Sequence, residues 1–543
     1  MANSMFQVPV PHNEPVFDYE PGSPVRAELK STLNDLAEKQ IEIPLIIGGE
    51  EVRTGNVGQA VMPHDHGHVL ATYHKAGEAE VQRAIETARE AWHDWSRLPW
   101  ETRSAVLLKA ADILTCRRRA EINAAAMLDL SKTAHQSEID AVAEMADFWR
   151  YNPYYAMQIM EPQPRNVPSV WNMTEQRPLE GFVLALTPFN FVSIAGNLPT
   201  APALMGNTVL WKPASSAVYS GYFVMRLLMD AGFPPGVINF VPGDGAAVGN
   251  PVLASPHLAG VHFTGSTGTF QHIWRTIGNN IQNYRSYPRV VGETGGKDFV
   301  IAHQSADVPA LITALVRGAF EFRGQKCSAA SRAYIPDTIW PEVRDGVLAE
   351  LSSVQMGDVR NFRNFMGAVI DQGAFDNITS YIELARTSPD AEILSGGGYD
   401  DSEGYFIEPT VVLTTNPHQR LMEEEIFGPV LTVYVYPADE YKETLRLVDT
   451  TSPYGLTGAV FAQDRLAAQK AMNDLRHAAG NFYINDKPTG AVVGLQPFGG
   501  SRASGTNDKA GSALNLERWV TPRTIKENFC PPTEYGYPYM GDS

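Results

Sequence analysis

The stretch TVLWKPASSAVYSGYFVMRLLMDAGFPPGVINFVPGDGAAVGNPVLASPHLAGVHFT, residues 208–264, decides the fold class. Short apolar runs at 208–211, 237–241 and 261–264 alternate with helical patterns at 219–229 and 246–253. Strands that alternate with helices in this way form parallel sheets joined by right-handed crossovers. The sequence therefore predicts an α/β protein with a nucleotide-binding style of sheet.

Similar patterns extend outward from this stretch in both directions. Apolar positions at helical spacing begin at Glu78, and helices are expected as far as about Met160. A polar, proline-containing excursion follows at 161–180. A second region of alternating strands and helices runs from Phe299 to about Ile484, with expected strands at 333–335, 406–411 and 430–435. The chain is therefore expected to hold two large α/β units.

Composition and charge narrow the class of protein. The chain has 543 residues, of which 44% are hydrophobic and 19% are charged, as in folded soluble proteins. Lys and Arg number 43 against 61 Asp and Glu, and the net charge of −18 disfavours nucleic acid as a partner. The longest uncharged stretch, 181–211, is interrupted by Pro and Asn, so no membrane span is expected. The start of the chain lacks the pattern of a targeting signal, which predicts a cytoplasmic location.

The three cysteines, Cys116, Cys327 and Cys530, are too few and too far apart for a disulfide framework. Cys327 lies in FRGQKCSAASR, residues 322–332, directly after Lys326. Nearby cations favour the thiolate, which is the nucleophilic form of cysteine. The alternative is that Cys327 is a small buried hydrophobic residue.

Three glycine-rich turns follow expected strands. In VINFVPGDGAAVG, 237–249, the glycines are spaced one residue too far apart for the dinucleotide fingerprint. In VHFTGSTGT, 261–269, a helix start could bind phosphate or could simply be a capped connection. In RVVGETGGKD, 289–298, Glu293 enters a glycine loop and is either a general base or a solvated turn residue.

Two clusters of polar residues carry weaker signals. His64, Asp65, His66 and His68 lie together, but their spacing fits no metal template, so no metal site is expected. The acidic run 423–425 precedes IFGPV and is, on its own, typical of a solvated helix end.

Seven motifs in order resemble those of the aldehyde dehydrogenase superfamily. They are PFNF (188–191), WKP (211–213), FTGS (263–266), GETGGK (292–297), GQKCS (324–328), EEIFGPV (424–430) and QPFGG (496–500). Within the superfamily, the chain most resembles the pyrroline-5-carboxylate dehydrogenases, also called glutamate semialdehyde dehydrogenases. That closer resemblance is carried by residues 13–29, 481–494 and 496–509.

The resemblance implies an aldehyde dehydrogenase fold with three parts. A Rossmann-like NAD-binding domain would comprise 1–160 and 182–293, with an N-terminal arm over 1–42 that wraps the surface. An α/β catalytic domain would comprise 294–498. A small β oligomerisation flap and tail would comprise 161–181 and 499–543. A homodimer is implied, further assembly is left open, and a proline dehydrogenase is a candidate partner.

The resemblance also implies the catalytic roles. Cys327 matches the nucleophile, which adds to an aldehyde to form a thiohemiacetal. Asn190 matches the side-chain donor of the oxyanion hole, together with the backbone N–H of Cys327. Glu293 matches the general base that activates water to hydrolyse the thioester.

NAD is the implied cofactor. Lys212 matches a lysine that holds the adenosine ribose, while Glu425 and Phe427 match the pair that positions the nicotinamide ribose and ring. Ser215 stands where many NAD-specific relatives carry a glutamate, which leaves NADP use open. The turn expected to meet the pyrophosphate comprises Gly265, Ser266, Thr267, Gly268 and Thr269.

The implied substrate is glutamate γ-semialdehyde, oxidised to glutamate in proline breakdown. Ser328 and the backbone N–H groups of Gly490 and Ala491 would bind its α-carboxylate, and Phe191 and Phe498 would flank its aliphatic chain. Three alternatives stay open: a dehydrogenase of another small aldehyde, a cofactor-free thiol esterase, and a catalytically silent protein on the same fold.

Overall fold

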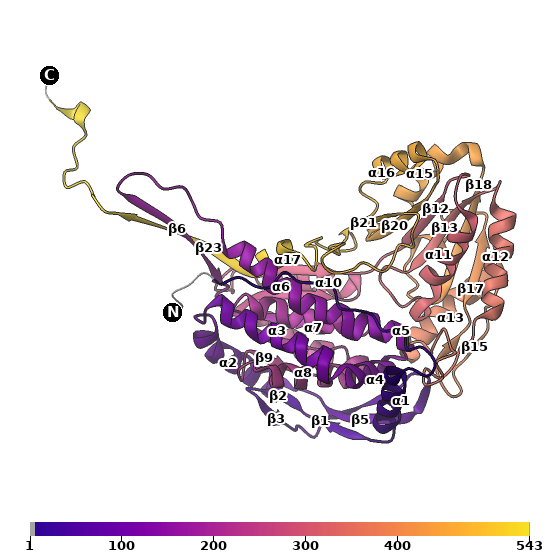
Figure 1. Ribbon diagram of the computed structural model, residues 1–543, viewed down its shortest axis with the longest axis horizontal. Coiled ribbons are helices and arrows are strands. Elements are labelled where there is room, and N and C mark those ends of the chain that lie inside the picture. The colour runs from indigo at the N-terminus through magenta and orange to yellow at the C-terminus, as the bar shows by residue number, and fades with distance from the viewer. Residues whose placement is uncertain (1–5, 542–543) are drawn as a thin grey trace.

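Two large sheets form the body of the protein (Figure 1). The computed structural model describes residues 6–541, so the first five residues of the expected arm and the last two of the expected tail lie outside the described part. Each large sheet has seven strands, and its central strands are parallel. The predicted α/β fold class is confirmed.

The first sheet contains the stretch that decided the fold class. The expected strands at 208–211, 237–241 and 261–264 are confirmed as parts of it, and antiparallel strands close one of its edges. In spatial order its strands are β11 (Arg289–Glu293), β10 (Leu258–Thr264), β7 (Phe182–Leu186), β8 (Thr208–Lys212), β9 (Ile238–Phe240), β2 (Leu45–Ile47) and β3 (Glu50–Val52).

Helices surround this first sheet. The pattern that begins at Glu78 is confirmed as an amphipathic helix that buries Val81, Ala84 and Ala88. The helical elements are α2 (Glu78–Trp95), α3 (Trp100–Arg117), α4 (Arg119–Leu130), α5 (Ala134–Ser137), the π-helical η1 (Glu138–Glu144), α6 (Met145–Met160), α7 (Val192–Leu204), η2 (Ser215–Ala217), α8 (Val218–Ala231), α9 (Gly245–Ala254) and α10 (Thr267–Asn279).

The N-terminal arm differs from the expectation of a segment that only wraps the surface. It contains α1 (Pro24–Ala37), which Ser23 caps and whose Leu29 and Leu33 are fully buried in the core beside α4. A small sheet of β1 (Ile41–Ile43), β5 (Asp65–His74) and β4 (Val57–Met62) follows. This part of the arm belongs to the core, because apolar residues four apart lie on the same face of α1 and pack inward.

The second sheet follows directly after β11. Its strands, in spatial order, are β14 (Ala391–Ser395), β17 (Thr410–Thr414), β18 (Val430–Tyr436), β13 (Ala330–Pro336), β12 (Asp298–Ala302), β20 (Thr457–Phe461) and β21 (Asn481–Ile484). Its helical elements are α11 (Val308–Phe320), η3 (Glu321–Gly324), α12 (Trp340–Ser353), α13 (Gln372–Thr387), α14 (Arg420–Glu423), η4 (Ala438–Glu440), α15 (Tyr441–Thr450) and α16 (Arg465–Asp474).

One expected strand of this region is wrong. The run at 406–411 is divided into β16 (Phe406–Ile407), which pairs with β15 (Tyr399–Asp400), and β17, which starts at Thr410 in the large sheet. Pro409 lies between them, and a proline has no N–H to donate to a ladder.

A two-stranded ribbon projects from the body and leads to the C-terminus (Figure 1). It pairs β6 (Val170–Pro178) with β23 (Val520–Asn528) in antiparallel register, and η5 (Pro538–Met540) follows. Residues 499–519 instead lie on the body: β22 (Ser501–Arg502) pairs with β19 (Tyr454–Gly455), and α17 (Ala513–Glu517) contacts α6. Within the described residues, no helix is both long and apolar enough to cross a membrane.

Candidate active site

A cavity of about 820 Å³ lies beyond the carboxyl ends of β7, β8, β10 and β11. Ligands of open α/β sheets bind at this end of the strands, because the turns that follow them meet there. Nine of the residues expected in the site line this cavity: Asn190, Lys212, Gly265, Ser266, Gly268, Thr269, Cys327, Glu425 and Phe427.

One end of the cavity fits a dinucleotide. Ser266 caps α10, and its Oγ accepts a hydrogen bond from the Thr269 N–H at 3.3 Å. The free N–H groups of this helix start favour an anionic group such as a pyrophosphate. A Cβ added at Gly268 would meet nothing within 4 Å, so the backbone there is open to a ligand. Thr267 is not in the wall, and its Oγ1 donates to the Ala503 carbonyl at 3.5 Å.

A second wall of this end was not predicted from the sequence. Gly245 and Gly249 of α9 line the cavity, and an added Cβ at either would meet nothing within 4 Å. Residues four apart lie on the same face of a helix. The four-residue spacing of these glycines could have identified the wall from the sequence. It was overlooked because the glycines were compared only with the dinucleotide fingerprint. His272 and Ile273 of α10 complete this wall.

Hydrogen bonds and packing hold the side chains of the remaining expected cofactor residues, Lys212, Glu425 and Phe427, in place. Burial lowers the pKa of Lys212, whose Nζ donates to the Pro213 carbonyl at 3.0 Å. Glu425 Oε1 accepts from the Gly296 N–H at 2.9 Å, and burial raises the Glu425 pKa to about 7. Glu425 is therefore not the solvated helix end that an acidic run suggests. The ring of Phe427 packs edge-on against Phe189 at 5.9 Å.

Cys327 is half-buried in the cavity wall. Burial raises the pKa of its thiol well above the usual range, and the charges of Asp298, Glu425 and Glu293 raise it further. The prediction that nearby cations favour the thiolate is wrong. Lys326 instead pairs with Glu321 at 3.3 Å. These surroundings favour the thiol over the thiolate, and a nucleophilic role requires loss of the thiol proton.

Glu293 ends β11 and is not a solvated turn residue. It does not line the cavity, but its charge is close enough to raise the pKa of this thiol. Its Oε2 accepts from the Gly500 N–H at 3.1 Å, and a Cβ added at Gly499 would lie 2.9 Å from Oε1. Burial raises the pKa of Glu293 well above its usual range. A carboxyl with a raised pKa is suited to accept a proton near neutral pH.

Asn190 is buried in the loop after β7, at the same end of the sheet as Glu293. Its Nδ2 donates to the carbonyl of Gln325 at 3.2 Å, which places the amide against the loop that carries Cys327. Asn190 also lines the cavity, and its amide group has a second N–H. An amide donor in the wall beside Cys327 is suited to stabilise an oxyanion.

The five expected substrate residues lie outside the wall of this cavity. The Ser328 Oγ lies 2.8 Å from the Thr489 Oγ1, so the serine contacts the loop that carries Gly490 and Ala491. The N–H of Phe498 donates to the Ala510 carbonyl at 3.0 Å. Phe191 lies under the buried Lys132 ammonium at 4.7 Å from the ring centre. Thr489 had no signal in the sequence.

The polar cluster near His64 has structural contacts. His64 Nδ1 lies 3.2 Å from the Ser131 Oγ, and burial lowers the His64 pKa to about 4. The Nε2 atoms of His66 and His68 lie within 2.8 Å and 2.7 Å of backbone carbonyls. Among residues 6–541 no group of three or more His, Cys, Asp or Glu side chains is placed to hold a metal ion.

A cysteine and an amide donor line one cavity with a dinucleotide-binding end, and a carboxyl base lies near the cysteine. This arrangement defines an enzyme that oxidises through a covalent thiol adduct. Residues 53–525 match the model of the aldehyde dehydrogenase family, and the chain belongs to that family.

More specific similarity covers almost the whole chain. It is 52% identical to a Delta-1-pyrroline-5-carboxylate dehydrogenase of Dictyostelium discoideum, over 98% of this chain and 96% of that protein. It is 50% identical to the Homo sapiens enzyme of that name, over 97% and 94% of the two chains. A crystal structure of the Delta-pyrroline-5-carboxylate dehydrogenase from Mycobacterium tuberculosis bound with NAD is 53% identical, with a TM-score of 0.96 and full coverage of both chains.

These similarities overturn one expectation from the sequence. The absence of a targeting pattern predicted a cytoplasmic location. The relatives from Dictyostelium discoideum and Homo sapiens are both named as mitochondrial enzymes, which points to a mitochondrial rather than a cytoplasmic location. The prediction is therefore wrong, and the reason is that a missing signal is weak evidence for any compartment.

Proposed function

We propose that this chain oxidises glutamate γ-semialdehyde, the open form of pyrroline-5-carboxylate, to glutamate in proline breakdown. The carrying observation is that Cys327 and the dinucleotide-binding end share one cavity. The end-to-end identity to Delta-1-pyrroline-5-carboxylate dehydrogenases supports the substrate. The cofactor is NAD, which supplies the acceptor for the hydride that the substrate carbon loses.

The first half-reaction depends on two residues of the cavity, Cys327 and Asn190. The Cys327 thiol releases its proton to solvent as the sulfur adds to the aldehyde carbon. The electron pair of the C=O bond moves onto oxygen, where the Asn190 amide and the Cys327 N–H donate hydrogen bonds to the new alkoxide. The carbonyl then re-forms as a hydride leaves, which produces a thioester on Cys327.

The second half-reaction releases the product. Glu293 takes a proton from water, and the resulting hydroxide adds to the thioester carbon. Asn190 donates to the oxyanion again, and the C–S bond breaks with return of a proton to the sulfur. The product is a carboxylate, and Cys327 is ready for another turnover.

The remaining expected residues complete this proposal. Lys212 would hold the adenosine ribose of NAD, residues 265–269 would meet its pyrophosphate, and Glu425 and Phe427 would position its nicotinamide end. Around the substrate, Ser328 and the N–H groups of Gly490 and Ala491 bind the α-carboxylate. Phe191 and Phe498 flank the aliphatic chain. The contact between Ser328 and the Thr489 loop supports the carboxylate assignment.

We also propose the three-part division and the assembly that the sequence implied, except that residues 499–519 belong to the body and not to the flap and tail. The change from the first sheet to the second between Glu293 and Asp298 supports a domain boundary at 293/294. The projecting β6–β23 ribbon supports a homodimer joined through this ribbon, because exposed strand edges favour pairing. A proline dehydrogenase, whose product is pyrroline-5-carboxylate, is the proposed partner.

The test of the function compares substrates and cofactors side by side. We expect absorbance of reduced nicotinamide to rise faster with pyrroline-5-carboxylate than with propanal, and faster with NAD than with NADP. The physical reason is that propanal has no carboxylate to accept hydrogen bonds from the donors proposed for the α-carboxylate. A preference for propanal would contradict the substrate, although not the cysteine chemistry.

Replacement of Asn190 by alanine tests the oxyanion hole. We expect kcat to fall by about 10²–10³-fold, because a preorganised donor to the alkoxide is lost. The KM for NAD should stay within about twofold, since Asn190 is not assigned to NAD binding. Steady-state kinetics measure both quantities. An unchanged kcat would show that the oxyanion is held by other donors.

A further inference from the structure

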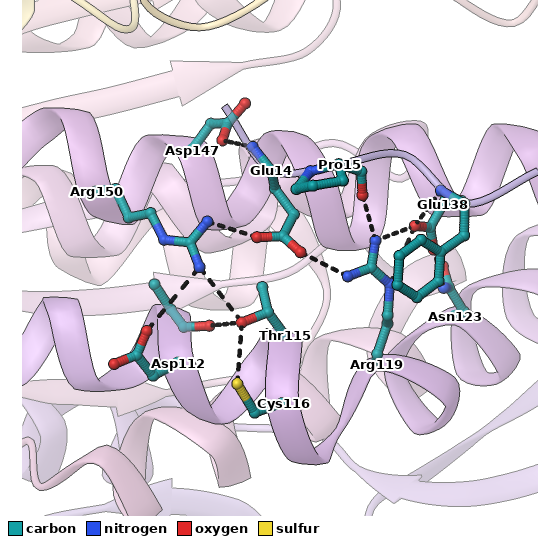
Figure 2. Close-up of polar contacts among 12 residues, drawn as sticks. Glu14, Pro15, Asp112, Thr115, Cys116, Arg119, Asn123, Glu138, Asp147 and Arg150 are labelled. Atoms are coloured by element: carbon teal, nitrogen blue, oxygen red, sulfur yellow. Dashed lines mark hydrogen bonds and ion pairs between the residues drawn. The ribbon is translucent and has the colours of Figure 1, made fainter. Parts of the chain in front are cut away.

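The N-terminal arm is fixed to the helices of the first domain by buried charges. Figure 2 shows the Glu14 carboxylate between Arg119 of α4 and Arg150 of α6, and each N–O distance is 2.6 Å. The Glu14 side chain is only 10% exposed. Further along the arm, the Phe17 N–H donates to Glu138 at 3.0 Å. The arm therefore has a defined path over α4 and α6.

Asn13 connects this arm to the loop of the proposed substrate site. Its Nδ2 donates to Asp147 Oδ2 at 2.7 Å and to the carbonyl of Val493 at 2.8 Å. Its Oδ1 accepts from the Tyr151 hydroxyl at 3.0 Å. Three bonds use both ends of the amide group, so its orientation is fixed. Residues 13 and 493 thus meet although 480 positions separate them.

The loop is held on both sides of its proposed ligand groups. On one side, Thr489 meets Ser328 through their hydroxyls at 2.8 Å. On the other side, Val493 is held by Asn13, and the next residue lies against α6: a Cβ added at Gly494 would lie 2.2 Å from the Tyr151 ring. Gly490 lies between the two attachments, and Ala491 follows it.

We propose that Asn13 is a positioning residue of the substrate site. By holding the Val493 carbonyl, it fixes the backbone N–H groups of Gly490 and Ala491 where an α-carboxylate is bound. The inference rests on the proposed function, which assigns those groups to the carboxylate. A loop that must be ordered during binding weakens affinity, because the entropy of ordering is then lost at that step. The reacting aldehyde carbon lies at Cys327, so kcat depends less on the loop.

The test is steady-state kinetics of Asn13→Ala with two aldehydes. We expect the KM for pyrroline-5-carboxylate to rise roughly five- to tenfold, the size of one lost hydrogen bond, with kcat within about twofold. With propanal, which has no carboxylate, kcat/KM should stay within about twofold. The propanal rate also reports whether the variant has folded.

Two further variants sharpen this test. Asn13→Asp keeps the size of the side chain but has no N–H to donate to Val493, so it should raise the KM for pyrroline-5-carboxylate in the same way. His12→Ala changes the exposed neighbour of Asn13 on the same arm and should leave both substrates unaffected. Thermal unfolding of all three variants compares their stability.

Each outcome decides the proposal. A selective rise in the KM for pyrroline-5-carboxylate in both Asn13 variants supports it. An unchanged KM, or equal losses with both aldehydes, overturns it, because the arm would then have no role or a general structural one. If the wild-type enzyme itself prefers propanal, the proposed function fails and the role of Asn13 fails with it. The wild-type comparison therefore separates the two failures.

Discussion

Replacement of Cys327 by alanine is expected to lower NADH formation from pyrroline-5-carboxylate by at least about 10⁴-fold. Without Sγ no thiohemiacetal forms, and direct removal of hydride from a hydrated aldehyde lacks the covalent intermediate that divides the reaction into two easier steps. The measurement is the change in absorbance of reduced nicotinamide under saturating NAD. Binding of NAD, followed by titration calorimetry, should stay within about threefold of the wild type.

The other two cysteines provide matched controls for this experiment. Cys116 and Cys530 are exposed at the surface, and neither lines the cavity. Cys116→Ala and Cys530→Ala should therefore keep activity within about twofold. Loss of activity in either of them, or turnover within tenfold of the wild type in Cys327→Ala, would remove the thiol mechanism.

Replacement of Glu293 by glutamine should separate the two half-reactions. We expect steady-state kcat to fall by about 10²–10⁴-fold, because no carboxylate is left to activate the hydrolytic water. The same change removes one of the charges that raise the pKa of Cys327, so the thiolate forms more readily. A single burst of NADH, about one per active site, should precede the slow phase in stopped-flow measurements.

The pH dependence gives a second signature of Glu293. Burial raises the pKa of its carboxyl, and only the ionised form accepts a proton. Wild-type kcat should therefore rise as the pH passes upward through this raised pKa, and that acid limb should be absent in Glu293→Gln. Glu180→Gln, which changes an exposed glutamate paired with Arg285, should keep the wild-type profile. An acid limb that persists in Glu293→Gln would assign it to another group.

Much of the fold could be predicted from local patterns. The strands β8, β9 and β10 and the helices α8 and α9 follow the runs of residues 208–264, because buried parallel strands are short and apolar and their helices carry an apolar face. Failures of prediction also had local causes. Hydrophobicity alone predicted one strand at 406–411, but Pro409 interrupts it. The prolines of the N-terminal segment made it resemble a surface arm, but its helix α1 buries residues in the core.

The candidate site was predictable only where residues belong to motifs. The order of the motifs predicted that Asn190, Glu293, Cys327 and the 265–269 turn belong to one site. Their proximity in space arises only because the loops that follow the strands meet at one end of the first sheet. The electrostatics were not predictable. Lys326 precedes Cys327 in sequence yet pairs with Glu321, while buried carboxyls raise the thiol pKa. Burial and charge neighbours are properties of the packed structure.

The sequence by itself determined the α/β class, the family and the residue types of the chemistry, because strand and helix periodicity and short motifs are local in the chain. Only the tertiary structure decided that Gly245 and Gly249 line the cofactor end, that Thr489 meets Ser328, and that Asn13 holds Val493. Except for the two glycines, these contacts join residues from distant parts of the chain. No local pattern encodes such contacts, because they exist only once helices and sheets have packed against one another.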